Sequence, residues 1–272
     1  MYQVSDIEIL IATMNRDDLA FLEVMFSKTD VTKYNILIIN QTTTEKQLHT
    51  TSHTINVINV LEKGLSKSRN LALQHATKKL LVFTDDDVVF EANFDTTILK
   101  AFSDHPHIDG FRFQYANSQS NLAKKYPSTF QSQLSTLEIL NTSTVELVFK
   151  QNSLTNVMLH FDENFGLGAR FCMGEEAIFL SEALANGLKI GFVPETLLTH
   201  PQPTTSQKVS VLERYFHQSA VFYRIFGKMY LFWVALKLLF DLKQGKIAIK
   251  AIPKVVSQAL KGKKAYVDTT AL

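Results

Sequence analysis

The stretch Leu80-Leu81-Val82-Phe83-Thr84-Asp85-Asp86-Asp87-Val88-Val89 decides the fold of this chain. Its apolar first half is rich in residues that favour β structure and predicts a buried strand over residues 80–84. Three carboxylates follow directly, and they repel one another unless a cation lies among them. Mg²⁺ and Mn²⁺ prefer such oxygen ligands and often share them with substrate phosphates. Because ligands of open α/β sheets bind at the carboxyl ends of strands, the run predicts a metal–diphosphate site there, with a solvated acidic turn as the alternative.

Strands alternate with helices on both sides of this stretch, which predicts an α/β fold. The apolar periodicity predicts strands over residues 7–13, 34–40, 55–60, 80–84, 109–115 and 189–193, strand-like segments over residues 145–150 and 154–160, and helices over residues 19–26, 64–77, 94–102 and 174–186. The connections are short, apart from a polar stretch over residues 117–135 that we expect to be a surface loop.

Composition limits the class of protein. The 272 residues are 46% hydrophobic, which is enough for one large domain with a core of its own, or for one domain plus an appendage. The single cysteine, Cys172, excludes a disulfide framework within the chain and a cysteine zinc site, and it fits a reducing compartment. The first residues form neither the basic nor the apolar region of a signal peptide. We therefore expect a cytoplasmic protein.

Charge is distributed unevenly along the chain. Residues 224–264 contain ten basic residues and one acidic residue, a net charge of +9, whereas residues 1–223 have a net charge of −6. We expect a domain over residues 1–205, a boundary near residues 204–208, and a basic amphipathic helical segment over residues 206–272.

Two partners are conceivable for the basic segment. Its uninterrupted apolar part is too short to span a bilayer. Lysines among aromatic and aliphatic residues favour binding of residues 224–264 to an anionic membrane surface, on the inner face of the cell membrane. The alternative is a pair of helices packed on the α/β domain with their lysines in solvent. We expect no nucleic acid partner, because the segment lacks arginine-rich and base-stacking patterns.

Two further segments contain residues suited to chemistry. The segment Lys63-Gly64-Leu65-Ser66-Lys67-Ser68-Arg69-Asn70 places basic and hydroxyl side chains at the start of a helix, where an anion can bind, although Arg69 is equally compatible with a solvated surface charge. Residues 161–176 contain three glycines followed by Glu175 and Glu176 at a helix start. Either carboxylate could deprotonate a hydroxyl as a general base, but acidic residues in a first helical turn are also expected on dipole grounds alone.

Five segments, in this order along the chain, resemble the family-two glycosyltransferases of the GT-A fold. They are Ile9-Leu10-Ile11-Ala12-Thr13-Met14-Asn15-Arg16, Gly64-Leu65-Ser66-Lys67-Ser68-Arg69-Asn70, Phe83-Thr84-Asp85-Asp86-Asp87 with its Asp-X-Asp pattern, Phe161-Asp162-Glu163 with Gly174-Glu175-Glu176, and the run from Gly187 through Pro194 to His200. The resemblance covers roughly residues 6–201. It implies a Rossmann-like mixed sheet flanked by helices, to which the basic segment adds a C-terminal helical extension.

The resemblance also implies a donor site. A nucleotide-sugar donor, with a UDP-sugar as the first choice, would bind at the acidic run. Asp87, Asp85 and His200 would hold Mn²⁺ or Mg²⁺, although His200 could equally be a strand-end histidine without a ligand role. The donor-binding residues implied are Thr13, Asn15, Arg16, Asn40, Arg69, Asp85 and Asp86. Asn40 stands where the family often has an aspartate, so the base preference stays open.

Glu176 stands where the family has the aspartate of a Glu-Asp pair, so we expect Glu176 to be the catalytic base, with Glu175 as the second candidate. The reaction implied is a metal-dependent, inverting transfer of a hexosyl group to a hydroxyl of a lipid-linked glycan acceptor in bacterial capsular or exopolysaccharide synthesis. The alternatives are a nucleotidyltransferase and a non-catalytic membrane-associated scaffold of the same fold. The sequence does not indicate an oligomeric state.

Overall fold

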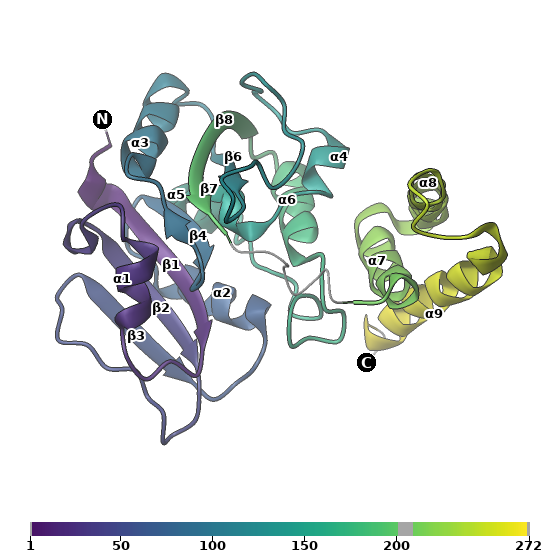
Figure 1. The fold of residues 1–272 in the computed structure, drawn as a ribbon, viewed down its shortest axis with the longest axis horizontal. Coiled ribbons are helices and arrows are strands. Elements are labelled where there is room, and N and C mark those ends of the chain that lie inside the picture. Colours follow the sequence, from purple (N-terminus) through teal and green to yellow (C-terminus); the bar gives the residue numbers. More distant parts are fainter. Residues whose placement is uncertain (1, 201–208, 271–272) are drawn as a thin grey trace.

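The computed structural model describes residues 2–200 and 209–270. A mixed eight-stranded sheet forms its centre, with helices on both faces and further helices from the C-terminal part beside it (Figure 1). This arrangement confirms the predicted α/β fold with a C-terminal helical extension. The expected boundary near residues 204–208 lies outside the described residues.

The regular elements of the described residues have the following bounds. The strands are β1 (Ile7–Met14), β2 (Asn35–Gln41), β3 (Ile55–Val60), β4 (Leu80–Asp85), β5 (Val89–Phe90), β6 (Gly110–Ala116), β7 (Leu147–Lys150) and β8 (Ile190–Thr199). The helices are α1 (Ala20–Met25), α2 (Leu65–His75), α3 (Phe94–Asp104), α4 (Thr136–Ile139), α5 (Gln151–Asn156), α6 (Glu175–Ala185), α7 (Val211–Phe226), α8 (Tyr230–Lys243) and α9 (Ile252–Thr270). Short 3₁₀ turns are η1 (Val4–Asp6), η2 (Val31–Lys33), η3 (Thr144–Glu146), η5 (Gly227–Met229) and η6 (Ile249–Ala251).

The order of the strands places several polar strand ends together. It is β3-β2-β1-β4-β7-β6-β8-β5, in which the first four strands are parallel. Their carboxyl ends therefore meet at one edge of the sheet. The register sets Thr13 opposite Asn40 and Ala12 opposite Asp85. The acidic run after β4 thus lies beside the end of β1, at the edge where ligands of open α/β sheets bind.

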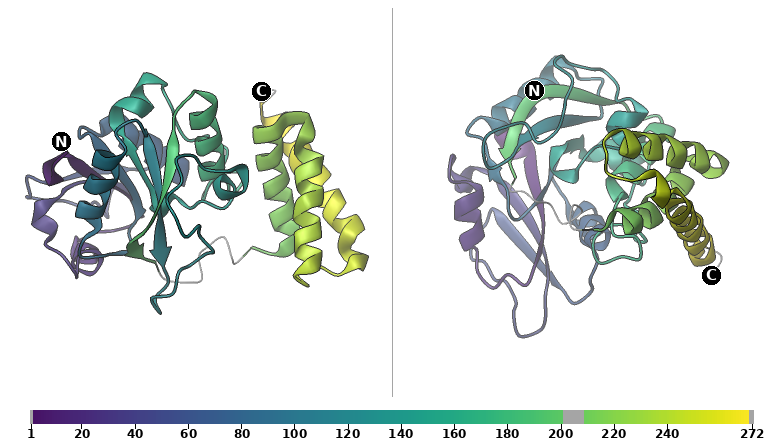
Figure 2. Two further views of the ribbon diagram at one scale, coloured as in Figure 1. Left: turned by 90° about the horizontal axis from the view of Figure 1, so that it is seen from above. Right: turned by 45° about the vertical axis from the view of Figure 1, so that its right-hand side comes forward.

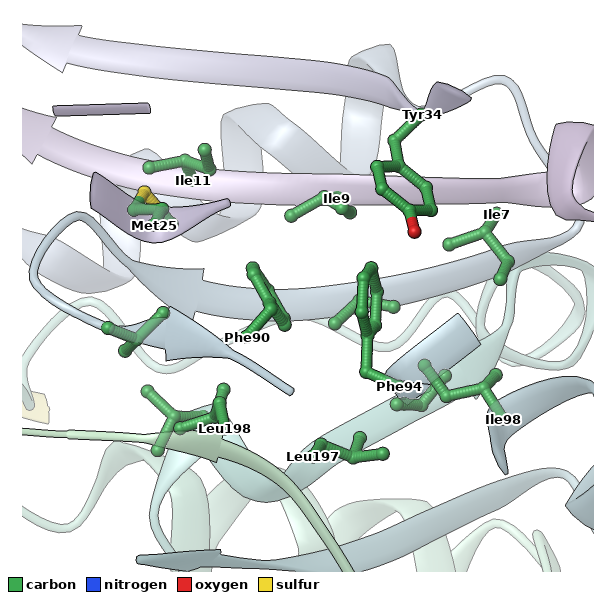
Figure 3. Close-up of a cluster of buried hydrophobic side chains, with 14 of the residues drawn as sticks. Ile7, Ile9, Ile11, Met25, Tyr34, Phe90, Phe94, Ile98, Leu197 and Leu198 are labelled. Carbon is green, nitrogen blue, oxygen red and sulfur yellow. The ribbon is translucent and has the colours of Figure 1, made fainter. Parts of the chain in front are cut away.

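Two apolar clusters cover the two faces of the sheet, and β1 contributes to both. Ile7, Ile9 and Ile11 belong to the cluster that contains residues of α1 and α3, whereas Leu10 belongs to the cluster with residues of α2 and α6. Figure 3 shows part of the first cluster, in which Ile9 of β1 and Phe94 of α3 both take part. A central strand that is buried on both faces has to be apolar at consecutive positions, which explains why these strands do not alternate between apolar and polar residues.

One predicted element is wrong, and another is longer than predicted. Residues 154–160, expected to be strand-like, begin inside helix α5. Leu154 and Val157 are three residues apart, so a helical turn brings both to the same side, where they pack against the second cluster. Strand β8 continues past residue 193 to Thr199, because residues 196–199 pair with β6. The other strands and helices predicted before residue 200 agree with the observed bounds to within two residues.

Helices α7, α8 and α9 pack together at one side of the sheet domain (Figure 2). Helices α7 and α9 are so close that a Cβ atom on Gly262 would lie 1.9 Å from the carbonyl oxygen of Phe216. Helix α7 also contacts the α/β part, since Arg224 pairs with Asp162 and Glu182. The C-terminal helices are therefore anchored to the sheet domain through α7.

Candidate active site

A cavity of about 770 Å³ opens at the carboxyl ends of β1 and β4. Most of the predicted site residues line it, namely Thr13, Arg69, Asp85, Asp86, Asp87, Glu175, Glu176 and His200. Asn15, Arg16 and Asn40 are not among the lining residues. The acidic run and the Glu175–Glu176 pair are far apart in the sequence, but they face the same cavity.

Arg69 connects these two sets of carboxylates. It lies in α2, is 4% exposed, and places its guanidinium 2.9 Å from Glu175 Oε1 and 3.4 Å from Asp85 Oδ1. The guanidinium also lies 5.5 Å from the ring centre of Phe161. This burial excludes the solvated surface charge that the sequence alone allowed. A buried arginine between two carboxylates offsets part of their charge and fixes their positions.

Glu175 and Glu176 are neighbours with different surroundings. Glu175 is 4% exposed, and burial together with the adjacent Glu176 carboxylate raises the pKa of Glu175 to about 8, an effect that Arg69 opposes. Glu176 is half-buried, and its Oε1 accepts a hydrogen bond from the Thr144 hydroxyl at 3.0 Å. Within the described residues, its Oε2 accepts no hydrogen bond. The geometry thus engages Glu175 with Arg69 and leaves one oxygen of Glu176 available to the cavity.

The glycine-rich segment before α6 allows Glu175 to reach Arg69. Gly166 has a φ of +100°, and a Cβ atom there would lie 3.0 Å from Ser66 Oγ and 3.2 Å from the carboxyl carbon of Glu175. Ser66, in the first turn of α2, donates its hydroxyl to the carbonyl of Phe165 at 2.6 Å. Glycine tolerates this backbone conformation and leaves room for the close approach. Through these contacts the segment brings the first turns of α2 and α6 together at the cavity.

Asp86 is held from the side of β1. Its Oδ2 accepts the Thr13 hydroxyl at 2.5 Å and lies 2.7 Å from Arg16 Nε. Asn40 is fully buried, and its amide binds the backbone N and O of Arg16 and the side chain of Asn59. Asn15 is exposed and has a φ of +55°. Asn40 and Asn15 therefore shape the loop after β1, while Thr13 and Asp86 lie in the cavity wall.

Asp87 and His200 meet at the end of β8, where His200 Nε2 lies 3.3 Å from Asp87 Oδ1. Carboxylate and imidazole groups are suitable ligands for Mn²⁺, and carboxylates for Mg²⁺, so the residues present fit such an ion. In residues 2–200 and 209–270, no three His, Cys, Asp or Glu side chains are grouped closely enough to hold a metal by themselves. Mg²⁺ is usually held by one or two carboxylates plus substrate phosphates, so a bound diphosphate would supply the remaining ligands.

The other wall of the cavity was not predicted from the sequence. It includes Tyr115, Lys124, Ser143, Thr144, Arg214 and Gln218. Lys124 holds part of this wall, since its ammonium donates to the carbonyl of Asn141 at 2.6 Å and to Ser143 Oγ at 2.8 Å. No motif marks these residues. For Lys124 alone there was a signal, the unusual length of the polar loop over residues 117–135, since long loops are often functional.

A family comparison identifies the chain. The model of the family described as "Glycosyl transferase family 2" matches residues 8–161, more than half of the sequence. The chain belongs to this family. It is therefore a glycosyltransferase, and the family predicted from the five segments is confirmed. A sequence comparison with the curated proteins finds no match.

Solved structures support the fold of this family-2 enzyme. The structure of S. aureus TarS 1-349 has a TM-score of 0.64 and 15% identity, covering 97% of this chain and 82% of that chain. The same fragment in complex with UDP-GlcNAc has a TM-score of 0.63 and 16% identity, over 93% and 79% of the two chains. Its complex with UDP has a TM-score of 0.59 and 15% identity, over 94% and 80%. At these identities the likeness is one of fold.

Proposed function

We propose that this glycosyltransferase moves a sugar from a UDP-sugar to a hydroxyl of a glycan acceptor, with inversion at the anomeric carbon. The observation that carries the proposal is one cavity lined by both the acidic run and Glu176, with Arg69 paired to Asp85 and to Glu175, the neighbour of Glu176. A leaving diphosphate needs positive charge nearby, and an attacking hydroxyl needs a base. TarS, which has a similar fold, has been solved with UDP-GlcNAc and with UDP, which favours a UDP-sugar as donor.

The donor side of the cavity consists of groups from β1, β4 and β8. Asp85, Asp87 and His200 would contribute ligands to Mn²⁺ or Mg²⁺, and the phosphates of the bound donor would supply the others. Such an ion supplies positive charge that stabilises a departing diphosphate. Thr13 and Asp86 are bonded to each other and would form the adjoining wall of the nucleotide pocket. Arg69 keeps Asp85 in place through an ion pair.

On the acceptor side, Glu176 takes the proton of the attacking hydroxyl. The hydroxyl oxygen forms the new bond to the anomeric carbon, the bond from that carbon to the diphosphate oxygen breaks, and its electron pair leaves with UDP. Attack from the side opposite to the leaving group inverts the configuration. The hydrogen bond from Thr144 fixes the orientation of the Glu176 carboxylate, which a general base requires.

Donor binding is tested by the melting temperature of the purified protein with nucleoside diphosphates, with and without Mn²⁺. We expect UDP with Mn²⁺ at about 100 times its Kd to raise the melting temperature by about 5 °C, because a ligand that binds only the folded state stabilises it. The substitution Asp87→Ala should remove the Mn²⁺-dependent part of this shift. The matched control, Asp104→Ala on the exposed end of α3, should keep it. A full shift in Asp87→Ala would contradict the assigned metal ligand, and no shift with any nucleoside diphosphate would contradict the donor site.

We further propose that the acceptor is lipid-linked and that the enzyme works on the inner face of a bacterial cell membrane in surface polysaccharide synthesis. The support is an apolar strip on α8, defined by Leu231, Phe232, Leu239 and Phe240, which are 48–64% exposed. Residues 224–264 around it have a net charge of +9. Exposed aromatic and aliphatic side chains beside lysines suit the interface of an anionic bilayer. In the described part of the chain, no helix is long and apolar enough to cross a membrane.

Flotation with lipid vesicles tests this surface. We expect the wild type to bind vesicles that contain phosphatidylglycerol. The double substitution Phe232→Glu with Leu239→Glu should lower the bound fraction by about tenfold or more, because two apolar side chains that would enter the bilayer are lost and two negative charges are added. The matched control, Val24→Glu with Leu61→Glu, changes residues that are 62% and 67% exposed on the sheet domain and should leave binding unchanged. Equal flotation of the two double variants would contradict the proposed surface.

A further inference from the structure

We propose that helix α7 carries an acceptor subsite, in which Arg214 binds an acidic group of the acceptor glycan and Gln218 binds a hydroxyl beside it. The inference rests on the proposed function, because the acceptor has to reach Glu176 in the same cavity. It identifies the acceptor as an acidic glycan, with a phosphate or carboxylate near the hydroxyl that is attacked.

One face of α7 forms part of the cavity wall. Arg214, Gln218, Val221 and Phe222 line the cavity, and their spacing of four, three and one residues places them on one side of a helix. Gly174, which directly precedes the two glutamates of α6, permits this contact, since a Cβ atom on Gly174 would lie 2.3 Å from Val221. Helix α7 therefore packs against the backbone that carries the proposed base.

Arg214 differs from the other basic residues of the cavity wall in its partners. Among residues 2–200 and 209–270, Arg214 makes no ion pair, and its guanidinium donates to the carbonyl of Val209 at 3.4 Å. Two other cations of the cavity wall are paired, Arg69 with Glu175 and Lys124 with Glu146. A planar guanidinium at a cavity wall is suited to bind a carboxylate or a phosphate through two parallel hydrogen bonds.

Gln218 supplies an independent observation at the same wall. Its Oε1 is buried and accepts no hydrogen bond in the described structure. An unpaired buried oxygen is unfavourable, and a donor from a ligand would satisfy it. Gln218 lies one helical turn after Arg214, so a hydroxyl next to the acidic group could reach it. Sugar units that carry an acidic group provide both partners.

The electrostatics of the cavity favour the same orientation. The wall formed by β1 and β4 ends in Asp85, Asp86 and Asp87. Where no metal ion shields these carboxylates, they repel an anionic acceptor. The wall formed by α7 presents Arg214. An acidic acceptor would therefore approach from the α7 side, with its reactive hydroxyl directed at Glu176 and its acidic group bound by Arg214.

Calorimetric titration of the UDP-loaded protein with three matched probes tests the subsite. The probes are octyl glucoside, octyl glucuronide and octyl glucoside 6-phosphate, which differ in the acidic group alone. We expect at least one acidic probe to bind the wild type about fivefold or more tightly than the neutral probe. The substitution Arg214→Ala should abolish this preference, Arg214→Lys should keep part of it, and Gln218→Leu should weaken all three probes about fivefold. The stronger of the two acids then identifies the acidic group.

The control for surface charge is Lys250→Ala, at an exposed lysine of η6, which should keep the full preference. The proposed subsite is wrong if the acidic probes bind the wild type no better than the neutral probe, or if no probe binds at all. It is also wrong if Arg214→Ala keeps the preference for the acidic probes. Titration with UDP separates this from the donor site, because Arg214→Ala should bind UDP within about twofold of the wild type. If UDP does not bind the wild type, the donor proposal fails, and the probes are titrated into the unliganded protein under the same criterion.

Discussion

Replacing Glu176 by Gln is expected to lower kcat for sugar transfer by about 10²–10⁴-fold, the usual contribution of a general base. Glutamine has nearly the same size and can still accept the hydrogen bond of the Thr144 hydroxyl, so the local structure should persist. It cannot take a proton from the acceptor. The KM for the donor should stay within about threefold, because the interaction that is lost belongs to the chemical step. Release of UDP from the best UDP-sugar, followed over time, measures both quantities.

Two further variants make this result specific. Glu45→Gln changes an exposed glutamate outside the cavity and should leave kcat unchanged. Glu175→Gln removes the carboxylate that pairs with Arg69, so its effect should fall on folding stability and on donor KM as well as on kcat. A Glu176→Gln protein that keeps more than about a tenth of the wild-type kcat would contradict the assignment of the base.

Replacing Glu146 by Ala is expected to lower the free energy of unfolding by about 3–5 kcal/mol, the usual effect of removing one partner from a buried ion pair. Glu146 has no exposed surface, and its carboxylate lies 3.2 Å from Arg112 and 3.1 Å from Lys124. The alanine would leave two cations in the interior without a counter-charge. Urea denaturation at pH 7 measures the change.

The same substitution should affect the cavity, because Glu146 ends the turn η3 that contains Thr144. Glu146→Gln keeps an acceptor oxygen and should be less destabilising than Glu146→Ala. The control Glu195→Ala, at an exposed position of β8, should change stability by less than about 0.5 kcal/mol. A loss below about 1 kcal/mol in Glu146→Ala would show that the buried cluster is not needed for stability.

The position of the acidic run at the cavity could be predicted from the sequence because each part is local. The strand over residues 80–84 and the acidic run after it are contiguous, and the parallel arrangement of strands places their ends together. The role of Arg69 could not be decided in this way. Its charge is compatible with solvent until the fold buries it between Glu175 and Asp85, residues that come from other elements.

The cavity wall that contains Lys124, Arg214 and Gln218 could not be predicted because it depends on contacts between distant segments. Lys124 lies in a loop without periodicity, and its role follows from its hydrogen bonds to residues 141–143. Arg214 and Gln218 belong to a helix whose sequence indicates only amphipathic packing, and they reach the cavity because Gly174 admits α7. The strand predicted over residues 154–160 was wrong for a different, local reason. The spacing of the few apolar residues in this segment fits a helical turn as well as a strand.

The most direct test of the proposed function is ³¹P NMR of the purified protein with Mn²⁺, a series of nucleotide sugars and the octyl glycosides as acceptors. We predict release of UDP from one UDP-sugar, faster with an acceptor than with water alone, and slower by about 10²-fold or more in Glu176→Gln. Release of pyrophosphate would instead indicate a nucleotidyltransferase. No turnover of any nucleotide sugar, in a folded sample that binds none of them, would contradict the proposed donor and its transfer.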